Sequence, residues 1–182
     1  TTYKNPFPII INTAQQWVDL VNGMFLKLGN NNEGDTVTIM ADLDFKDLEY
    51  NTDVTFKGVV NGNGKTFKNL KASSPLLKSV TTVKDLTIDS SCSFETSELT
   101  EFASVATTVT GELRNVKNNA SVTAVLGDIT AAYVVGGLAG YAYGNIIECE
   151  NGGDVKITAS SANTGAVGGI VGYTEAQVNN TN

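Results

Sequence analysis

The sequence predicts an all-β fold, a single-stranded right-handed parallel β-helix built from irregular repeats of about 30 residues, with an amphipathic helix at its N-terminal end. Three observations predict it: a glycine-tyrosine segment that occurs twice, apolar residues that recur at matched positions, and one stretch with helical periodicity. We expect residues 1–182 to form one domain, with a capping helix over about 12–29 and β-helix rungs over about 36–182.

The helix comes first in the chain. Thr13 with Gln16 fits a capping box, and Gly29 suits a helix end. One apolar stripe at helical spacing lies between them, made of Trp17, Leu20, Val21, Met24, Phe25 and Leu28. Such a face can cover the unpaired backbone of a first rung, and we prefer this role to docking of a partner. Residues 36–45, TVTIMADLDF, then read as the strands that lead into the first rung.

The rungs are marked by a repeat. VGGLAGY at 135–141 and VGGIVGY at 167–173 are offset by 32 residues and keep their glycines and tyrosine in register. The corresponding middle rung, FASVATTVTG at 102–111, has lost the paired glycines. A unit of this kind cannot bury its own apolar face, so copies must stack on one another as a solenoid.

Apolar positions extend the register through the chain. We take the first members as Phe67, Val83, Leu113, Ile146 and Val178, and the second members as Leu70, Leu86, Val116, Cys149 and Thr181. Alternating strand pairs follow at Cys92 with Phe94, Val122 with Ala124 and Val155 with Ile157. A β-sandwich or propeller would also be rich in strands, but its strands need no positional match at this interval.

These residues resemble a known family. FKGVVNGNGKTFKNL at 56–70, preceded by ADLDF and followed by the two glycine-tyrosine segments, resembles the GLUG-repeat region of bacterial surface adhesins and of some IgA-peptidase-like proteins. The resemblance covers about 12–182. It implies a pectate-lyase-like β-helix, export, display at the cell surface or secretion, and no catalytic residues.

Composition and charge exclude several classes of function. Residues 1–91 carry 9 Lys/Arg and 10 Asp/Glu, and residues 92–182 carry 3 and 9, so the second half holds most of the net charge of −7. We therefore expect no nucleic-acid partner. The absence of histidine and the single Arg114 remove the usual general base and the Ser-His and Cys-His nucleophile pairs. We predict a protein that is not an enzyme.

No stretch approaches the ~18 apolar residues that a membrane helix needs, and the N-terminus lacks a signal-peptide pattern. We expect no membrane insertion of this segment and a monomer, with any signal or anchor removed. The last repeat stops at Asn182, four residues past Val178, so we expect the solenoid to continue in a longer protein.

The two cysteines should be free. Stacking puts Cys92 and Cys149 two repeats apart, roughly 10 Å along the axis, which exceeds the Cα separation of about 7 Å that a disulfide tolerates. We interpret both as buried small hydrophobic residues.

Paired carboxylates are the remaining route to metal or acid-base chemistry. Asp42 and Asp44 share one face of a strand and could hold a calcium ion, the one cofactor that the sequence suggests, or act as acid and base. Glu148 and Glu150 flank the inward-facing Cys149 and should face solvent. We prefer a structural or solvating role for all four.

Tyr133, Tyr141, Tyr143 and Tyr173 are the candidate ligand-binding residues. Because Tyr141 and Tyr173 align between repeats, their rings should stack and could lie against sugar rings. A recurring tyrosine could instead pack on the glycine-rich corner, and the sequence favours that simpler reading.

The sequence thus supports a non-catalytic adhesin or display module that contacts an extracellular glycan or host protein. A polysaccharide lyase or glycoside hydrolase on the same fold is the first alternative. A spacer that only separates other domains is the second.

Overall fold

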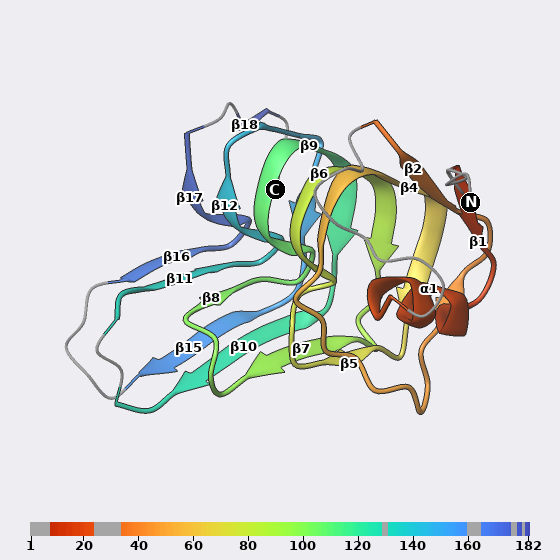
Figure 1. The fold of residues 1–182 in the computed structure, drawn as a ribbon. Coiled ribbons are helices and arrows are strands. Elements are labelled where there is room, and N and C mark those ends of the chain that lie inside the picture. The colour runs from red at the N-terminus through yellow and green to blue at the C-terminus, as the bar shows by residue number, and fades with distance from the viewer. Residues whose placement is uncertain (1–7, 24–33, 129–130, 160–164, 176–177, 180) are drawn as a thin grey trace, which may run out of the picture.

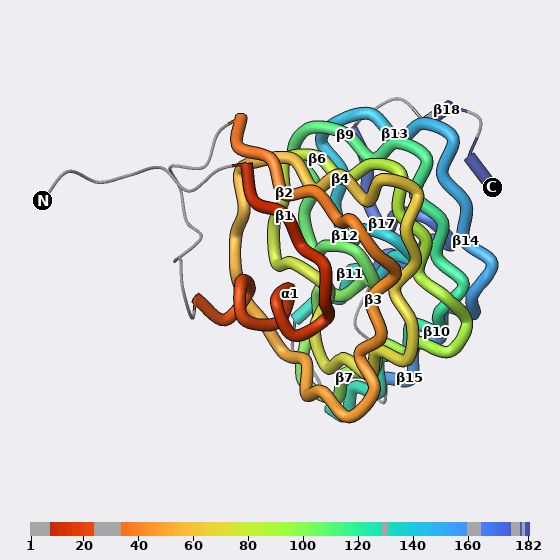
Figure 2. The backbone as a smooth tube through the Cα atoms, turned by 90° about the vertical axis from the view of Figure 1, so that its right-hand side faces the viewer, coloured from red at the N-terminus to blue at the C-terminus, as the bar shows by residue number. Residues whose placement is uncertain are grey.

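A computed structural model describes residues 8–23, 34–128, 131–159, 165–175, 178–179 and 181–182 of this chain. It confirms the predicted fold class: the strands stack as a parallel β-helix of about five turns, with one short helix near the N-terminus (Figure 1). Figure 2 shows the successive turns wound around a common interior.

Three sheets form the walls. Sheet A has β1 (Ile9–Ile11), β2 (Thr36–Ile39), β3 (Leu43–Asp44), β4 (Thr55–Lys68), β6 (Leu77–Ile88), β9 (Ala106–Asn118), β12 (Ala139–Ala142), β13 (Asn145–Ile147), β14 (Glu150–Asn151), β17 (Val171–Thr174) and β18 (Val178–Asn179). Sheet B has β5 (Lys71–Ala72), β7 (Ser93–Thr96), β10 (Ser121–Leu126) and β15 (Val155–Ala159). Sheet C has β8 (Glu101–Phe102), β11 (Tyr133–Gly136) and β16 (Gly165–Gly168).

The predicted register is confirmed over the later turns and wrong at its first step. Val83 lies opposite Leu113, Leu113 opposite Ile146, and Ile146 opposite Val178. The partner of Val83 in the preceding turn is Val60 and not Phe67, which lies opposite Ile88. A bulge between Asn61 and Lys65, with Asn63 and Gly64 at positive φ, absorbs extra residues in β4 and displaces the later residues of that strand.

The alternating strand pairs that begin at Cys92 with Phe94 need a similar correction. Val122 lies opposite Val155 as predicted, but its partner in the preceding turn is Phe94. Cys92 comes two residues earlier, where its thiol donates to Phe67 O at 3.3 Å. Both Cys92 and Cys149 are buried and free, as the sequence predicted.

The rung without paired glycines keeps its register. Phe102 lies opposite Val135, and Val135 lies opposite Val167, so Ala103 and Ser104 stand where the next turn has Gly136 and Gly137. The Ser104 hydroxyl donates to Gly137 O at 2.6 Å. This hydrogen bond ties the two turns together at the corner.

At the N-terminal end, helix α1 (Ala14–Val21) begins with the predicted capping box, in which Thr13 Oγ1 accepts from Gln16 N at 3.1 Å. Its buried face includes Trp17, Leu20 and Val21. The expected continuation through Met24, Phe25 and Leu28 to Gly29 lies outside the described residues. Strand β1, which pairs with β2 just before the helix, was not predicted.

Trp17 joins the helix to the first turns. Its ring meets Phe67 edge-on with centroids 5.5 Å apart, and its Nε1 donates to the Tyr50 hydroxyl at 2.8 Å. That hydroxyl donates in turn to Leu76 O at 2.6 Å. The buried face of α1 thus packs on the first turns as the sequence predicted, together with β1.

The turns lengthen along the chain. Register partners are 23 residues apart from Val37 to Val60 and from Val60 to Val83, 30 from Val83 to Leu113, and 33 from Leu113 to Ile146. The added residues build sheet C, whose outer strand β8 belongs to the first long turn. A step in the wall therefore lies where the short turns meet the long ones.

Candidate binding surface

Three tyrosines gather on and beside sheet A, where Tyr143 lies in the bend between β12 and β13. Tyr141 on β12 lies opposite Tyr173 on β17, as predicted, with ring centroids 6.0 Å apart in an edge-to-face arrangement. Tyr143 lies beside Tyr141 with centroids 6.3 Å apart and ring planes 7° from parallel. We call Tyr141, Tyr143 and Tyr173 the tyrosine cluster.

The rings of this cluster reach solvent. Tyr143 is 49% exposed and Tyr173 45%, whereas Tyr141 is half-buried. The Tyr173 hydroxyl donates to Glu175 Oε1 at 3.0 Å, and this hydrogen bond raises the pKa of the phenol. Burial raises the pKa of Tyr141, with a further contribution from the charge of Glu101 and a hydrogen bond to it. The hydroxyls of Tyr141 and Tyr173 thus have carboxylate partners, while the rings of Tyr143 and Tyr173 remain partly exposed to solvent.

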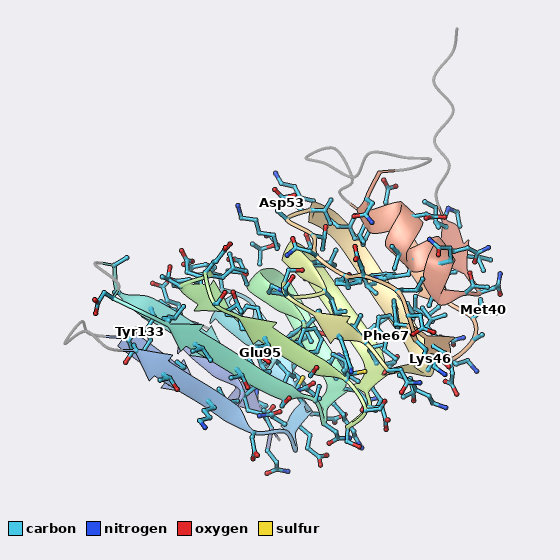
Figure 3. The ribbon with its side chains drawn as sticks, turned by 90° about the horizontal axis from the view of Figure 1, so that it is seen from below. Met40, Lys46, Asp53, Phe67, Glu95 and Tyr133 are labelled. Carbon is cyan, nitrogen blue, oxygen red and sulfur yellow. The ribbon has the colours of Figure 1, made fainter. Side chains whose placement is uncertain are left out.

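Tyr133 does not join the cluster. It lies on β11 in sheet C, opposite Gly165 of β16, and its half-buried ring occupies the space that a Cβ on Gly165 would need. Figure 3 shows Tyr133 at the sheet C side of the molecule. Packing on the neighbouring turn accounts for this tyrosine, so the four predicted ring positions divide between two faces.

Asp42 and Asp44 are exposed on the same side of the chain, with buried Leu43 between them. Asp42 Oδ1 accepts from Thr66 N at 2.9 Å, and its Oδ2 lies 3.7 Å from Lys68 Nζ. Asp44 Oδ1 accepts from Asn69 Nδ2 at 2.9 Å, which lowers the pKa of this carboxyl. Both carboxylates link β3 to the next turn.

Across the described part of the chain, no group of three or more Asp, Glu, Cys or His side chains is placed to hold a metal ion. Glu148 and Glu150 are exposed on either side of buried Cys149, as expected. Calcium binding by Asp42 and Asp44 stays a prediction.

A cavity of about 640 Å³ lies at the step between short and long turns. Its lining comes from four loops and strands: Asn51, Thr52, Asp53, Ser73, Ser74, Pro75, Lys78, Glu95, Thr96, Ser97, Glu98, Leu99, Thr100, Glu101 and Thr107. All of these except Pro75 and Leu99 are polar. We call it the step cavity, and its volume is in the range of small-molecule sites.

The walls of the step cavity are tied by hydrogen bonds. Thr96 Oγ1 accepts from Glu98 N at 3.2 Å and from Leu99 N at 3.0 Å, which shapes the loop after β7. On the opposite wall, the buried hydroxyl of Ser74 accepts from Thr52 N at 2.8 Å. The two walls are thus built before any ligand arrives.

The charge of the step cavity is negative. Asp53, Glu95, Glu98 and Glu101 face a single cation, Lys78, among the lining residues. Figure 3 shows Asp53 on the loop that leads into β4 and Glu95 on β7. A second hollow of about 450 Å³ shares Asn51, Ser73 and Glu95 with the step cavity and extends over β5.

No family model, curated protein or solved structure matches this chain. The parallel β-helix therefore rests on the structure itself, and membership of the GLUG-repeat family stays a prediction. Among the residues that the structure describes, no helix has the length and apolar character to span a membrane.

Proposed function

We propose that this chain is a non-catalytic binding module of a bacterial cell-surface or secreted protein, an adhesin or display module that contacts an extracellular glycan as a monomer. The observation that supports it most is the tyrosine cluster, in which two solvent-exposed rings, Tyr143 and Tyr173, flank a third. Aromatic rings offer large contact area with few rotatable bonds, so little entropy is lost when they meet a sugar face.

Location and origin rest on the resemblance of residues 56–70 and the glycine-tyrosine segments to GLUG repeats. The negative charge of the second half, which carries the tyrosine cluster, adds a constraint, since it disfavours anionic partners such as nucleic acid.

A glycan array tests this proposal. Wild-type protein should retain glycans that Tyr141→Ala/Tyr173→Ala binds at least about tenfold more weakly, as expected when central aromatic contacts are truncated. Val125→Ala is the matched control, because Val125 is also an exposed side chain but lies on β10 in sheet B. Absence of binding across neutral, amino, uronic and sulfated glycans would contradict a glycan-binding adhesin and favour the spacer.

One observation favours the enzymatic alternative. Four carboxylates, Asp53, Glu95, Glu98 and Glu101, line a single cavity, and paired carboxylates are the machinery of glycoside hydrolases. The chain supplies no histidine, and Arg114 does not line this cavity. An activity assay separates an enzyme from a non-catalytic binding module. The protein is incubated with any glycan found on the array, and new reducing ends or unsaturated products are measured. Product formation that Glu95→Gln abolishes would overturn the non-catalytic proposal.

A further inference from the structure

The step cavity and the tyrosine cluster are neighbours on one surface. Glu101 lines the step cavity and also lies beside Tyr141, where its charge adds to the rise in the pKa of that phenol that burial causes. Thr107 lines the cavity too, and the next residue, Thr108, lies opposite Tyr141 in the adjacent turn. A ligand could therefore pass from one to the other without crossing an unrelated surface.

From this juxtaposition we infer that the step cavity is a binding subsite for an extended, uncharged glycan chain, which continues from the cavity past Glu101 onto the tyrosine cluster. The inference rests on the proposed glycan-binding function and adds the site, the direction of the chain and its charge class.

The lining has the chemistry that sugars require. Hydroxyls of Ser73, Ser97 and Thr100 and the amide of Asn51 both donate and accept hydrogen bonds, as sugar hydroxyls do. Carboxylates such as Glu98 add strong acceptors. Ligand sites combine placed polar groups with aromatic side chains, and here the cavity supplies the polar groups while Tyr141, beside Glu101, belongs to the aromatic cluster.

The shape indicates a chain and not a single sugar. The step cavity and the second hollow share Asn51, Ser73 and Glu95, so the concave surface runs on from β8 to β5. A monosaccharide would use only part of this length. The hydrogen bonds of Thr96 and Ser74 hold the walls in place, which reduces the entropy lost on binding.

Charge selects the ligand class. With four carboxylates against Lys78, the cavity repels uronate or sulfate groups, so each close like-charge contact has a cost in binding free energy. Neutral chains avoid this cost while keeping every hydrogen bond.

The test uses oligosaccharides of glucose, mannose, galactose and N-acetylglucosamine, with oligogalacturonate as the acidic probe, measured by calorimetry. Ser97→Trp places a large side chain in the cavity from an exposed position and should weaken neutral binding at least about tenfold. Thr158→Trp, an equally exposed change on β15 at the far edge of sheet B, should leave binding unchanged.

A second variant keeps the test open if Ser97→Trp unfolds. Glu95→Lys lowers the negative charge where the two hollows meet and should strengthen oligogalacturonate binding about fivefold. Neutral binding that depends on Tyr141 and Tyr173 but is unchanged in Ser97→Trp, or oligogalacturonate binding that is unchanged in Glu95→Lys, would overturn the inference alone. No binding of any probe would overturn the proposed function with it.

Discussion

The first and the last described turns of the solenoid present the same kind of strand in different surroundings. At the N-terminal end, β1 and α1 cover the first turn, and Trp17 is 2% exposed. At the other end, β15, β16 and β17 are the outer strands of their sheets (Figure 1). Val167 there is 53% exposed, although Val135, its partner one turn earlier, is fully buried.

This difference teaches that a rung acquires its core only from its neighbours. Val135 and Val167 have the same side chain at the same register position, so the contrast in burial comes from stacking alone. At the N-terminal end a helical face substitutes for the missing neighbour. The apolar side chains of β15, Val155 and Ile157, stay half-buried because their second neighbour is not among the described strands.

The largest expected effect concerns the capped end. Trp17→Ala removes the ring that packs on Phe67 and donates to Tyr50, and it should lower the free energy of unfolding by about 3–5 kcal/mol. Urea unfolding measures this loss in the free energy of unfolding. Tyr173→Ala, at an exposed position on the last described turn, is the comparison and should cost less than about 1 kcal/mol. Equal costs at both ends would contradict the distinction drawn between them.

A matched pair isolates stacking from side-chain type. Val135→Ala should lower the free energy of unfolding by about 2 kcal/mol, because two methyl groups leave a filled interior. Val167→Ala should change it by no more than about 0.5 kcal/mol. Similar values for the two valines in thermal or urea unfolding would show that the last turn is covered in solution.

The buried hydroxyl beneath the cap predicts a dependence on alkaline pH. Burial raises the pKa of Tyr50 well above its usual value near 10, so above that pH the unfolded chain binds fewer protons than the folded one. Stability should be unaffected by this group below pH 10 and then fall by up to about 1.4 kcal/mol per pH unit. The Tyr50→Phe variant should lose that slope. It should keep the pH dependence of stability that comes from Cys92 and Cys149, because burial also raises the pKa values of these thiols.

The smallest effect concerns the first residue of the helical cap. Thr13→Ala removes the side chain that accepts from Gln16 N and should cost about 1 kcal/mol. Thr13→Asn, which preserves an acceptor at this position, should restore most of the loss. Hydrogen exchange of the α1 amides measures both variants, and unchanged exchange in Thr13→Ala would show that tertiary packing alone holds the helix.

The sequence predicted the later turns well because their spacing is nearly constant. Val83, Leu113, Ile146 and Val178 could be aligned from 30 to 33 residues apart. The earlier turns are shorter and include the bulge after Asn61. The sequence therefore matched Phe67 to Val83, whereas its partner in the structure is Ile88. Strand β1 is only three isoleucines long, which is too short for a period to appear.

The candidate site was predicted in part. The alignment of Tyr141 with Tyr173 follows from the repeated motif. The step cavity could not be found in this way, because its residues come from separate loops between Asn51 and Thr107. The only sequence signal was the change in turn length, and the incorrect 16-residue offset from Phe67 to Val83 concealed it.

The two buried, free thiols can report which turn of the chain opens first. Cys92 lies in the first long turn, while Cys149 lies two turns later, where Asn182 N donates to its carbonyl at 2.8 Å. Only an opened turn exposes a buried thiol to a labelling reagent. If the described turns detach one by one from the C-terminal side, alkylation of Cys149 precedes that of Cys92, and the difference between the two labelling rates measures how fast fraying moves along the axis.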